Sequence, residues 1–400
     1  MTVRTSIYGL IASLGQSLLS LSFNLGGILA GTLIVVYLDV FPQVPWALAL
    51  FPGILSIRGA IGGLFCGRLS TGLHLGIVKP SFTENTRNFY LLFYSIITLT
   101  LESSIAMGLV ASLFNVVILR IGLIDCVSII VLAISTMGLS IVLISPITIA
   151  VSFLSFRRGL DPDIIVYPVI STVADVLVTL CYILQLNIFL MPTSSGIYGI
   201  GLSAFLFLFI VLYILAKHGR EGEFVKTVKE FFVTLVLAAF IVNVTGSFLN
   251  KIREVVGSRP EVYVVYPALI DTVGDVGSIT GSTATTKLFL GVMKSSFSSI
   301  RQHLTQIGGA WIASMLMFFL YSILPFAHGE VALGHMLKFS AQLLTTNILA
   351  VSAMVIIAFT VAILTYRRGL DPDNFVIPIE SSLADSLTTV SLLAALSAIG

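Results

Sequence analysis

The sequence contains the heptapeptide RRGLDPD twice, at residues 157–163 and again at residues 367–373. When both copies are extended to 19 positions without gaps, 12 of the 19 are identical. A second pair of segments, 52–76 and 267–291, also matches, and each begins with proline and carries recurring glycines and an adjacent pair of hydroxyl residues. Two blocks that recur in the same order predict a tandem duplication. The chain is therefore expected to fold as two similar halves.

Apolar segments show what each half is made of. The chain is 57% hydrophobic and only 10% charged, which leaves too little polar surface for a soluble protein of 400 residues. Apolar runs long enough to cross a hydrocarbon core of roughly 30 Å predict an all-α, polytopic membrane protein with about eleven transmembrane helices. The predicted spans are 8–38, 46–78, 88–119, 126–156, 162–190, 197–216, 228–250, 262–292, 302–325, 332–366 and 373–398.

The repeated blocks assign five helices to each copy and leave the helix at 197–216 outside both. Because an odd number of crossings would invert the second copy, the additional helix restores its orientation. We therefore predict two parallel five-helix repeats related by a pseudo-twofold axis along the membrane normal. The predicted units are a first repeat at 1–192, a linker helix and basic loop at 193–225, and a second repeat at 226–400. A monomer would then contain both halves of any central path.

The basic residues predict the direction of insertion. Of the 21 Lys and Arg residues, 13 fall in segments on the N-terminal side of the membrane, five on the opposite side and three within spans. The positive-inside rule then places the N-terminus in the cytoplasm and the C-terminus outside a cell membrane. The net charge is only +2 and the basic residues form short clusters between apolar runs, so the expected partner is the lipid bilayer and not nucleic acid. The three cysteines lie in apolar segments and predict no disulfide framework.

The heptapeptide is typical of a corner between two helices. Arginines suit the end of the first helix, glycine can take the left-handed stop, aspartate can cap the next helix, and proline is favoured at its first position. This structural role alone accounts for the whole motif. The capping acids, Asp161 and Asp371, are also placed at the cytoplasmic mouth of a central path.

Two further acids, Asp175 and Asp385, follow the capping aspartates by 14 residues, or about 21 Å along a helix, and so lie deep in the bilayer. An ionised aspartate that faces lipid there costs on the order of 2.5 to 3.5 kcal/mol or more, so each must face water, a cation or a partner. A structural role, with an arginine partner or as a protonated carboxyl, is one interpretation. Because the duplication places both carboxylates about one axis, a cation site between them is the other.

The second repeated block adds oxygen ligands to this prediction. Asp275 makes the second half more acidic than the first, and small residues bring backbone carbonyls and hydroxyls near the path, although close helix packing also explains the glycines. Glu102 is expected to support the path, with an ion pair to Arg58 or Arg68 as the alternative. The residues expected to line or support the path are Gly59, Gly274, Ser70, Thr71, Thr285, Thr286, Asp271 and Glu102.

Signals for other chemistry are weak. His74 and His303 have no partners at metal-ligand spacing, and no HExxH or CxxC motif occurs, so an imidazole or thiolate metal site is not expected. No paired nucleophile and base, zinc motif or phosphate-binding loop is recognisable, so an enzyme is the weakest class and no cofactor is expected.

The corner, the later proline and the deep aspartate together resemble the MgtE family of magnesium channels and transporters, especially its two-repeat members, which include animal solute carriers for magnesium. The segment GRLSTGLHLG at 67–76, at the end of a proline-to-glycine helix, adds to the resemblance. It implies a pore between two five-helix units on a twofold axis, where Asp175 and Asp385 would bind hydrated magnesium. This chain departs from the family's usual Gly-Asn, because alanine follows Gly59 and aspartate follows Gly274.

Magnesium also fits the residues themselves, because it prefers oxygen ligands and sheds water reluctantly. We therefore predict a divalent cation channel or transporter, with magnesium as the expected ion and Asp175, Asp385 and Asp275 as its metal site. Calcium, manganese and cobalt fit the same residues. The alternative is a proton- or sodium-coupled transporter of a metal ion or small substrate, since paired intramembrane carboxylates and parallel repeats also serve alternating access.

Overall fold

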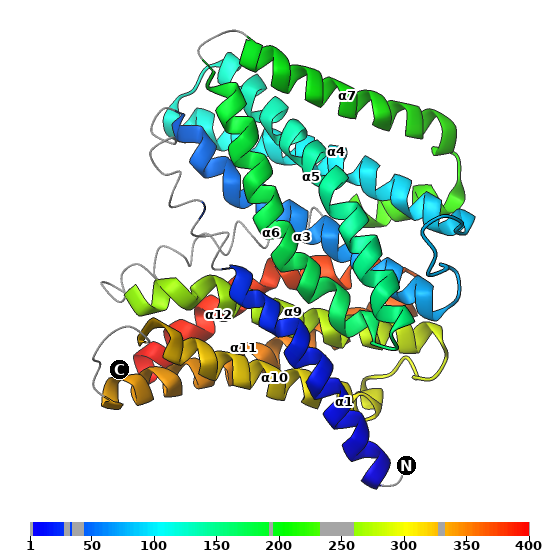
Figure 1. Ribbon diagram of the computed structural model, residues 1–400, viewed down its shortest axis with the longest axis vertical. Coiled ribbons are helices and arrows are strands. Elements are labelled where there is room, and N and C mark those ends of the chain that lie inside the picture. Colours follow the sequence, from blue (N-terminus) through cyan, green and yellow to red (C-terminus); the bar gives the residue numbers. More distant parts are fainter. Residues whose placement is uncertain are drawn as a thin grey trace.

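The computed structural model describes residues 3–27, 33, 44–191, 195–232, 260–326 and 333–399, and every long element there is a helix (Figure 1). The helices are α1 (Val3–Leu21), α3 (Pro45–His74), α4 (Arg87–Leu119), α5 (Leu123–Arg157), α6 (Pro162–Phe189), α7 (Ser195–His218), α9 (Pro260–Phe289), α10 (Leu304–Ile323), α11 (Leu333–Arg367) and α12 (Val376–Ala398). Short 3-10 turns extend four of these regions: η1 (Ser22–Gly26), η3 (Phe297–Gln302), η4 (Leu324–Phe326) and η5 (Pro372–Asn374). Residues 222–232 are also helical.

The predicted all-α membrane architecture is confirmed. Six of the described helices, α4, α5, α6, α7, α10 and α11, are long and apolar enough to cross a bilayer. Ten of the predicted spans overlap the helices named above, and the eleventh overlaps only residues 228–232 of the helical segment 222–232. The eleventh, at 228–250, lies mostly outside the described residues, as does the end of the first span at 8–38, so the number eleven stays a prediction.

The helices form two groups that stack on one another. In Figure 1, α3 to α7 make up the upper group, and α9 to α12 make up the lower group. The exception is α1, which crosses the lower group and packs against α10. The first helix of the chain therefore binds the second half to the first.

The two RRGLDPD corners have the local structure that the sequence predicts. Gly159 and Gly369 both have φ of +72°, in the left-handed region that ends a helix. Asp161 and Asp371 each accept a hydrogen bond from the backbone N–H two residues later, at 3.0 and 3.1 Å, and so cap the following turn. Because both copies take the same conformation, the stretches that follow leave the corners in equivalent positions.

Contacts between the halves bear on the direction of the pseudo-twofold axis. Helix α3 contacts α12, and α9 contacts α6 in the reciprocal way. The duplicated residues Thr71 and Thr286 meet with their Oγ1 atoms 3.3 Å apart, and twelve residues earlier Gly59 and Gly274 line one cavity. Counterparts therefore lie at the interface at two levels, about 18 Å apart along the same helices. This arrangement agrees with an axis along the helices, because an axis across them would exchange the two levels, and the parallel orientation of the repeats stays a prediction. The unit boundaries at 192 and 225 stay predictions.

Candidate functional site

A cavity of about 410 Å³ lies between the two halves of the protein. Its walls come from α3, α6, α9 and α12, and Gly27 closes one side. The residues around it are Gly27, Phe51, Leu55, Arg58, Gly59, Tyr167, Ser171, Asp175, Pro267, Ile270, Asp271, Gly274, Asp275, Ser381, Ala384 and Asp385. The structure thus brings together six of the residues that the sequence nominated: four aspartates and two glycines.

The four carboxylates belong to three helices. Asp175 lies on α6, Asp385 lies on α12, and Asp271 and Asp275 lie on α9. Residues four apart share one face of a helix, so Asp271 and Asp275 line the cavity one turn apart. Asp175 and Asp385 reach it because each stands about four turns beyond an identical corner. The periodicity of the helices therefore directs all four acids into one space.

Arg58, on α3, occupies the same cavity and makes it asymmetric. Its Nη2 atom lies 2.5 Å from Asp175 Oδ1 and donates a hydrogen bond of 2.6 Å to the carbonyl of Ser171. The counterpart of Arg58 in the second half is Val273, and Asp385 has no ion pair among the described residues. The arginine partner that the sequence offered as an alternative is thus present for Asp175 and not observed for Asp385.

The remaining arginine nitrogens have an unusual environment. Arg58 Nε and Nη1 are buried and have no hydrogen-bond partner in the part of the chain that the structure describes. The oxygen Asp275 Oδ2 is likewise buried without a partner, and its residue is only 1% exposed. Buried polar groups without partners are costly and often mark a place where water or an ion binds.

The turn that follows α1 covers the cavity on the side where Gly27 lies. Asn24, in η1, donates a hydrogen bond of 3.2 Å to Thr272 and accepts one of 3.2 Å from Thr172, so it joins α9 to α6. A Cβ atom at Gly27 would lie 2.8 Å from Asp271 Oδ2. Only glycine lets the backbone pass this close to the carboxylate without displacing it.

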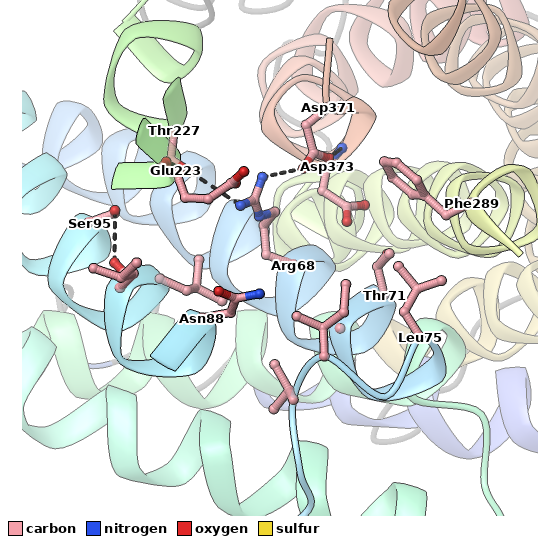
Figure 2. A pocket seen from close by; sticks show the side chains of 15 residues that line it. Arg68, Thr71, Leu75, Asn88, Ser95, Glu223, Thr227, Phe289, Asp371 and Asp373 are labelled. Carbon is pink, nitrogen blue, oxygen red and sulfur yellow. Dashed lines mark hydrogen bonds and ion pairs between the residues drawn. The ribbon is translucent and has the colours of Figure 1, made fainter. Parts of the chain in front are cut away.

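The nominated hydroxyls lie at a second level, nearer the corners. Ser70, Thr71, Thr285 and Thr286 are all buried, and none of them lines the deep cavity. Thr71 lines a separate pocket of about 240 Å³, together with Arg68, Asp371 and Asp373 (Figure 2). The structure therefore divides the predicted path into a deep level and a level at the mouth.

The acids at the mouth have different partners in the two halves. Asp371 forms an ion pair with Arg68, whose Nη2 atom also donates a hydrogen bond of 3.3 Å to Thr227, as Figure 2 shows. Asp161 instead lies beside His74, with His74 Nε2 3.3 Å from Asp161 Oδ1. The predicted mouth residues thus occupy equivalent corners, but Asp161 lies beside a residue of its own half, whereas Asp371 is paired with an arginine of the other half.

Glu102 is the nominated residue that lies apart from the others. It is on α4, lines neither of the two cavities, and makes no ion pair with Arg58 or Arg68 among the described residues. Its predicted role as a support for the path stays a prediction.

Sequence reasoning missed the acids that surround His74 in the structure. Sequence spacing identified no metal-ligand partners for His74, whereas the structure places it with Asp161 and Asp163 so that one donor atom of each lies within 4.8 Å of the others. These partners are 87 and 89 positions away along the chain, so local spacing could not reveal them. Glu380 stands opposite Ile170 of the first repeat, which adds to the acidity of the second half, but it was not among the predicted site residues.

Comparison with known proteins adds independent information. The model of the MgtE family, described as a divalent cation transporter, matches residues 51–185 and 266–395. Solute carrier family 41 member 2 of Xenopus laevis is 23% identical over 394 residues, covering 90% of this chain and 66% of the frog protein, so the chain spans slightly less than two thirds of that relative. A solved MOP superfamily transporter from Pyrococcus furiosus Vc1 (DSM3638) covers 98% of this chain and is itself covered to 96%, with 13% identity and a TM-score of 0.38, which is too low to support a structural argument.

Proposed function

We propose that this chain, which belongs to the MgtE family of divalent cation transporters, carries magnesium as a hydrated ion along a path between its two halves. Membership of a transporter family also favours transport over an enzymatic activity. The proposed site is the deep cavity, with Asp385, Asp275 and Asp271 as the principal ligands and Asp175 as a fourth carboxylate held by Arg58.

The observation that carries this proposal is the convergence of four carboxylates on one cavity. With every group ionised, the four aspartates and Arg58 sum to −4 + 1 = −3. Such a concentration of like charge in a bilayer is costly unless cations balance it. A divalent cation with its water molecules offsets most of this charge and leaves the carboxylates in a polar environment.

The size of the cavity supports a hydrated ion over a bare one. Magnesium keeps several waters and is usually held through one or two carboxylates. Six waters occupy about 180 Å³ at roughly 30 Å³ each, which the cavity of about 410 Å³ can contain. A bare ion could not touch carboxylates from three helices across such a space.

The second level extends the proposed path toward the corners. Thr71 and Thr286 meet at the axis, and the acids Asp163 and Asp373 begin the stretches that follow the corners and are 4% and 1% exposed. We propose that these oxygens pass the ion between the deep cavity and the mouth, where Asp371 lies. The N-terminal side of the membrane, where the basic corners lie, is proposed to be cytoplasmic. A monomer contains the whole of this path.

A coupled transporter is the second candidate, and Glu380 is the observation that favours it. This residue is 0% exposed, and neither of its carboxyl oxygens has a hydrogen-bond partner among the described residues. A Cβ atom at Gly281 of α9 would lie 2.8 Å from Glu380 Oε1, so the carboxyl is wedged between α12 and α9. Proton binding to such a group would be linked to any movement between these helices.

Ion flux into liposomes tests the proposal. We expect purified wild-type protein to admit magnesium, detected by an enclosed dye, and D385N and D275N to lose at least tenfold of the flux. At an effective dielectric constant near 20, one unit charge at 4 to 5 Å contributes about 3 to 4 kcal/mol per charge of the ion. E84Q, which removes an exposed acid in the α3–α4 loop, is the matched control. A D275N/D385N double variant with wild-type flux would refute the assignment.

The same liposomes separate the two candidates. A channel should follow the magnesium gradient and the membrane potential alone. A coupled transporter should respond to an imposed proton or sodium gradient at fixed magnesium gradient, and E380Q should remove a proton response.

A further inference from the structure

His74, Asp161 and Asp163 form a cluster that the deep cavity does not use. His74 is the last residue of α3, Asp161 caps α6, and Asp163 lies in the first turn of α6. His74 Nε2 lies 3.3 Å from Asp161 Oδ1 and 3.7 Å from Asp163 Oδ2. One donor atom from each residue lies within 4.8 Å of the others, which is close enough for one metal ion to contact all three.

The cluster also has an unsatisfied buried oxygen. Asp163 is 4% exposed, and its Oδ1 atom has no hydrogen-bond partner among the residues that the structure describes. A buried carboxylate oxygen without a partner has lost its hydration without gaining a hydrogen bond, which is unfavourable. A cation between the two aspartates would remove this cost.

Neighbouring groups orient two members of the cluster, His74 and Asp161. The edge of the His74 ring packs against Phe156, with ring centroids 5.7 Å apart. Asp161 is fixed at its backbone, because its N–H donates a hydrogen bond of 2.7 Å to Gln16 Oε1. Oriented ligands lose little conformational entropy when a metal binds, which favours a true site over a chance grouping.

One positively charged side chain lies near the cluster but forms no ion pair with it. Lys287, on α9, interacts electrostatically with Asp161 and Asp163 but lies beyond 4 Å of both. Its Nζ atom instead donates a hydrogen bond of 3.0 Å to His303 Nδ1. The two aspartates therefore keep oxygens available for another cation.

The second half of the protein lacks this arrangement. The counterpart of His74 is Phe289, which lines the mouth pocket together with Asp371 and Asp373 (Figure 2). At that corner the positive charge comes from the protein, because Arg68 forms an ion pair with Asp371. The corner of the first half thus places a histidine beside its two carboxylates, whereas the corner of the second half has a phenylalanine at that position and pairs Asp371 with Arg68 from the first half.

We propose that His74, Asp161 and Asp163 form a second cation site, outside the deep cavity, that takes a divalent transition metal such as zinc, cobalt or manganese in preference to magnesium. An imidazole nitrogen suits zinc, cobalt and nickel, whereas magnesium strongly favours oxygen ligands. Two carboxylates add charge and leave open positions for water. The bound metal joins the end of α3 to the beginning of α6, two helices that also line the deep cavity.

Equilibrium binding of zinc to the purified full-length protein tests this site. We expect one zinc ion to remain bound in millimolar magnesium, and H74F, which installs the residue of the second half, to weaken zinc binding at least tenfold. H335Q is the matched control, because among the described residues His335 pairs with a single acid, Glu261, at 3.6 Å. D385N should keep zinc binding, which separates this site from the proposed transport site. Unchanged zinc affinity in H74F, or its loss in D385N, would overturn the proposal.

A measurement on the unmodified protein covers the case in which H74F does not fold. The side chain of His74 is 25% exposed and that of His335 is 52% exposed, so both can react with diethyl pyrocarbonate. Mass spectrometry should show that zinc protects His74 and leaves His335 reactive, and that the same concentration of magnesium protects neither. Equal modification of His74 with and without zinc would contradict the proposal.

Discussion

Arg58 Nη2 lies 2.5 Å from Asp175 Oδ1 within the cavity between the halves. The duplicated position in the second half is Val273, so one of the two matching deep aspartates has an arginine partner and the other does not. An ion entering the cavity therefore meets two unlike carboxylates. Asp385 is available to it, whereas Asp175 is already shared with a positive charge that belongs to the protein.

The charge of the cavity predicts how variants of this pair behave. D175N leaves Arg58 buried without its partner and reduces the negative charge of the cavity from −3 to −2, so magnesium binding should weaken about tenfold or more. The double variant R58V/D175N returns the net charge to −3 and should recover most of the affinity lost in D175N. Isothermal titration with magnesium measures both.

R58V alone supplies the complementary prediction. Removing one member of a buried ion pair costs about 3 to 5 kcal/mol, but a bound cation can replace the arginine. We expect R58V to unfold at a lower temperature than the wild type in chelator, and magnesium to recover more of that loss than it does for the wild type. R87A is the control, because Arg87 is 77% exposed in its pair with Glu221 and should contribute at most about 1 kcal/mol. An R58V protein that gains no more from magnesium than the wild type would show that no ion replaces the arginine.

Much of the local structure could be predicted because it depends on neighbouring residues. The corners follow from glycine, aspartate and proline in fixed order, and both copies adopt the expected conformation. The spacing of 14 residues between cap and deep acid also fixes how far Asp175 and Asp385 stand from the corners. These inferences need only the rise of a helix and the preferences of single residues.

Partners from different helices could not be predicted in the same way. Arg58 and Asp175 are 117 positions apart, and His74 and Asp161 are 87 apart. Their meeting depends on how α3 crosses α6, which helix periodicity does not determine. The duplication narrows the choice only where both copies carry the same residue, as at Thr71 and Thr286. Arg58 and His74 have no equivalents in the second half, so symmetry gave no information about them.

The absence of a side chain at Gly27 is predicted to leave room for the carboxylate of Asp271, a proposed magnesium ligand. A Cβ atom there would lie 2.8 Å from Asp271 Oδ2, so G27A should displace this carboxylate and weaken magnesium binding several-fold, with little effect on unfolding because the flexible end of one side chain yields. G15A is the matched control, since no atom lies within 4 Å of a Cβ atom at Gly15. Titration with magnesium and a thermal unfolding scan measure the two effects. Equal affinity in G27A and G15A would show that Asp271 is not a ligand.

The stability of the protein is predicted to depend slightly on pH through Glu221, which lies outside the membrane-spanning helices. Hydrogen bonds from His218 and Arg87 hold the pKa of this partly exposed carboxyl below its usual value of 4.5. Because the folded-state pKa is the lower one, its contribution to stability is present above about pH 4.5 and is lost as the pH falls through the folded-state value. The melting temperature of E221Q should therefore approach that of the wild type below pH 4 and fall slightly under it at pH 7. A constant difference across this range would exclude the linkage.

Close packing between the halves gives the sharpest prediction about stability. A Cβ atom at Gly63 on α3 would lie 2.9 Å from Ile377 Cβ on α12, at the start of a branched side chain that cannot turn away. Alanine gains up to about 1 kcal/mol over glycine in a helix, but overpacking costs about 1 to 3 kcal/mol, so G63A should unfold at lower temperature than the wild type. G62A, where the nearest atom is an arginine nitrogen at 3.6 Å, should be neutral or stabilised. If G63A were as stable as G62A, the close contact between α3 and α12 at Gly63 would be contradicted.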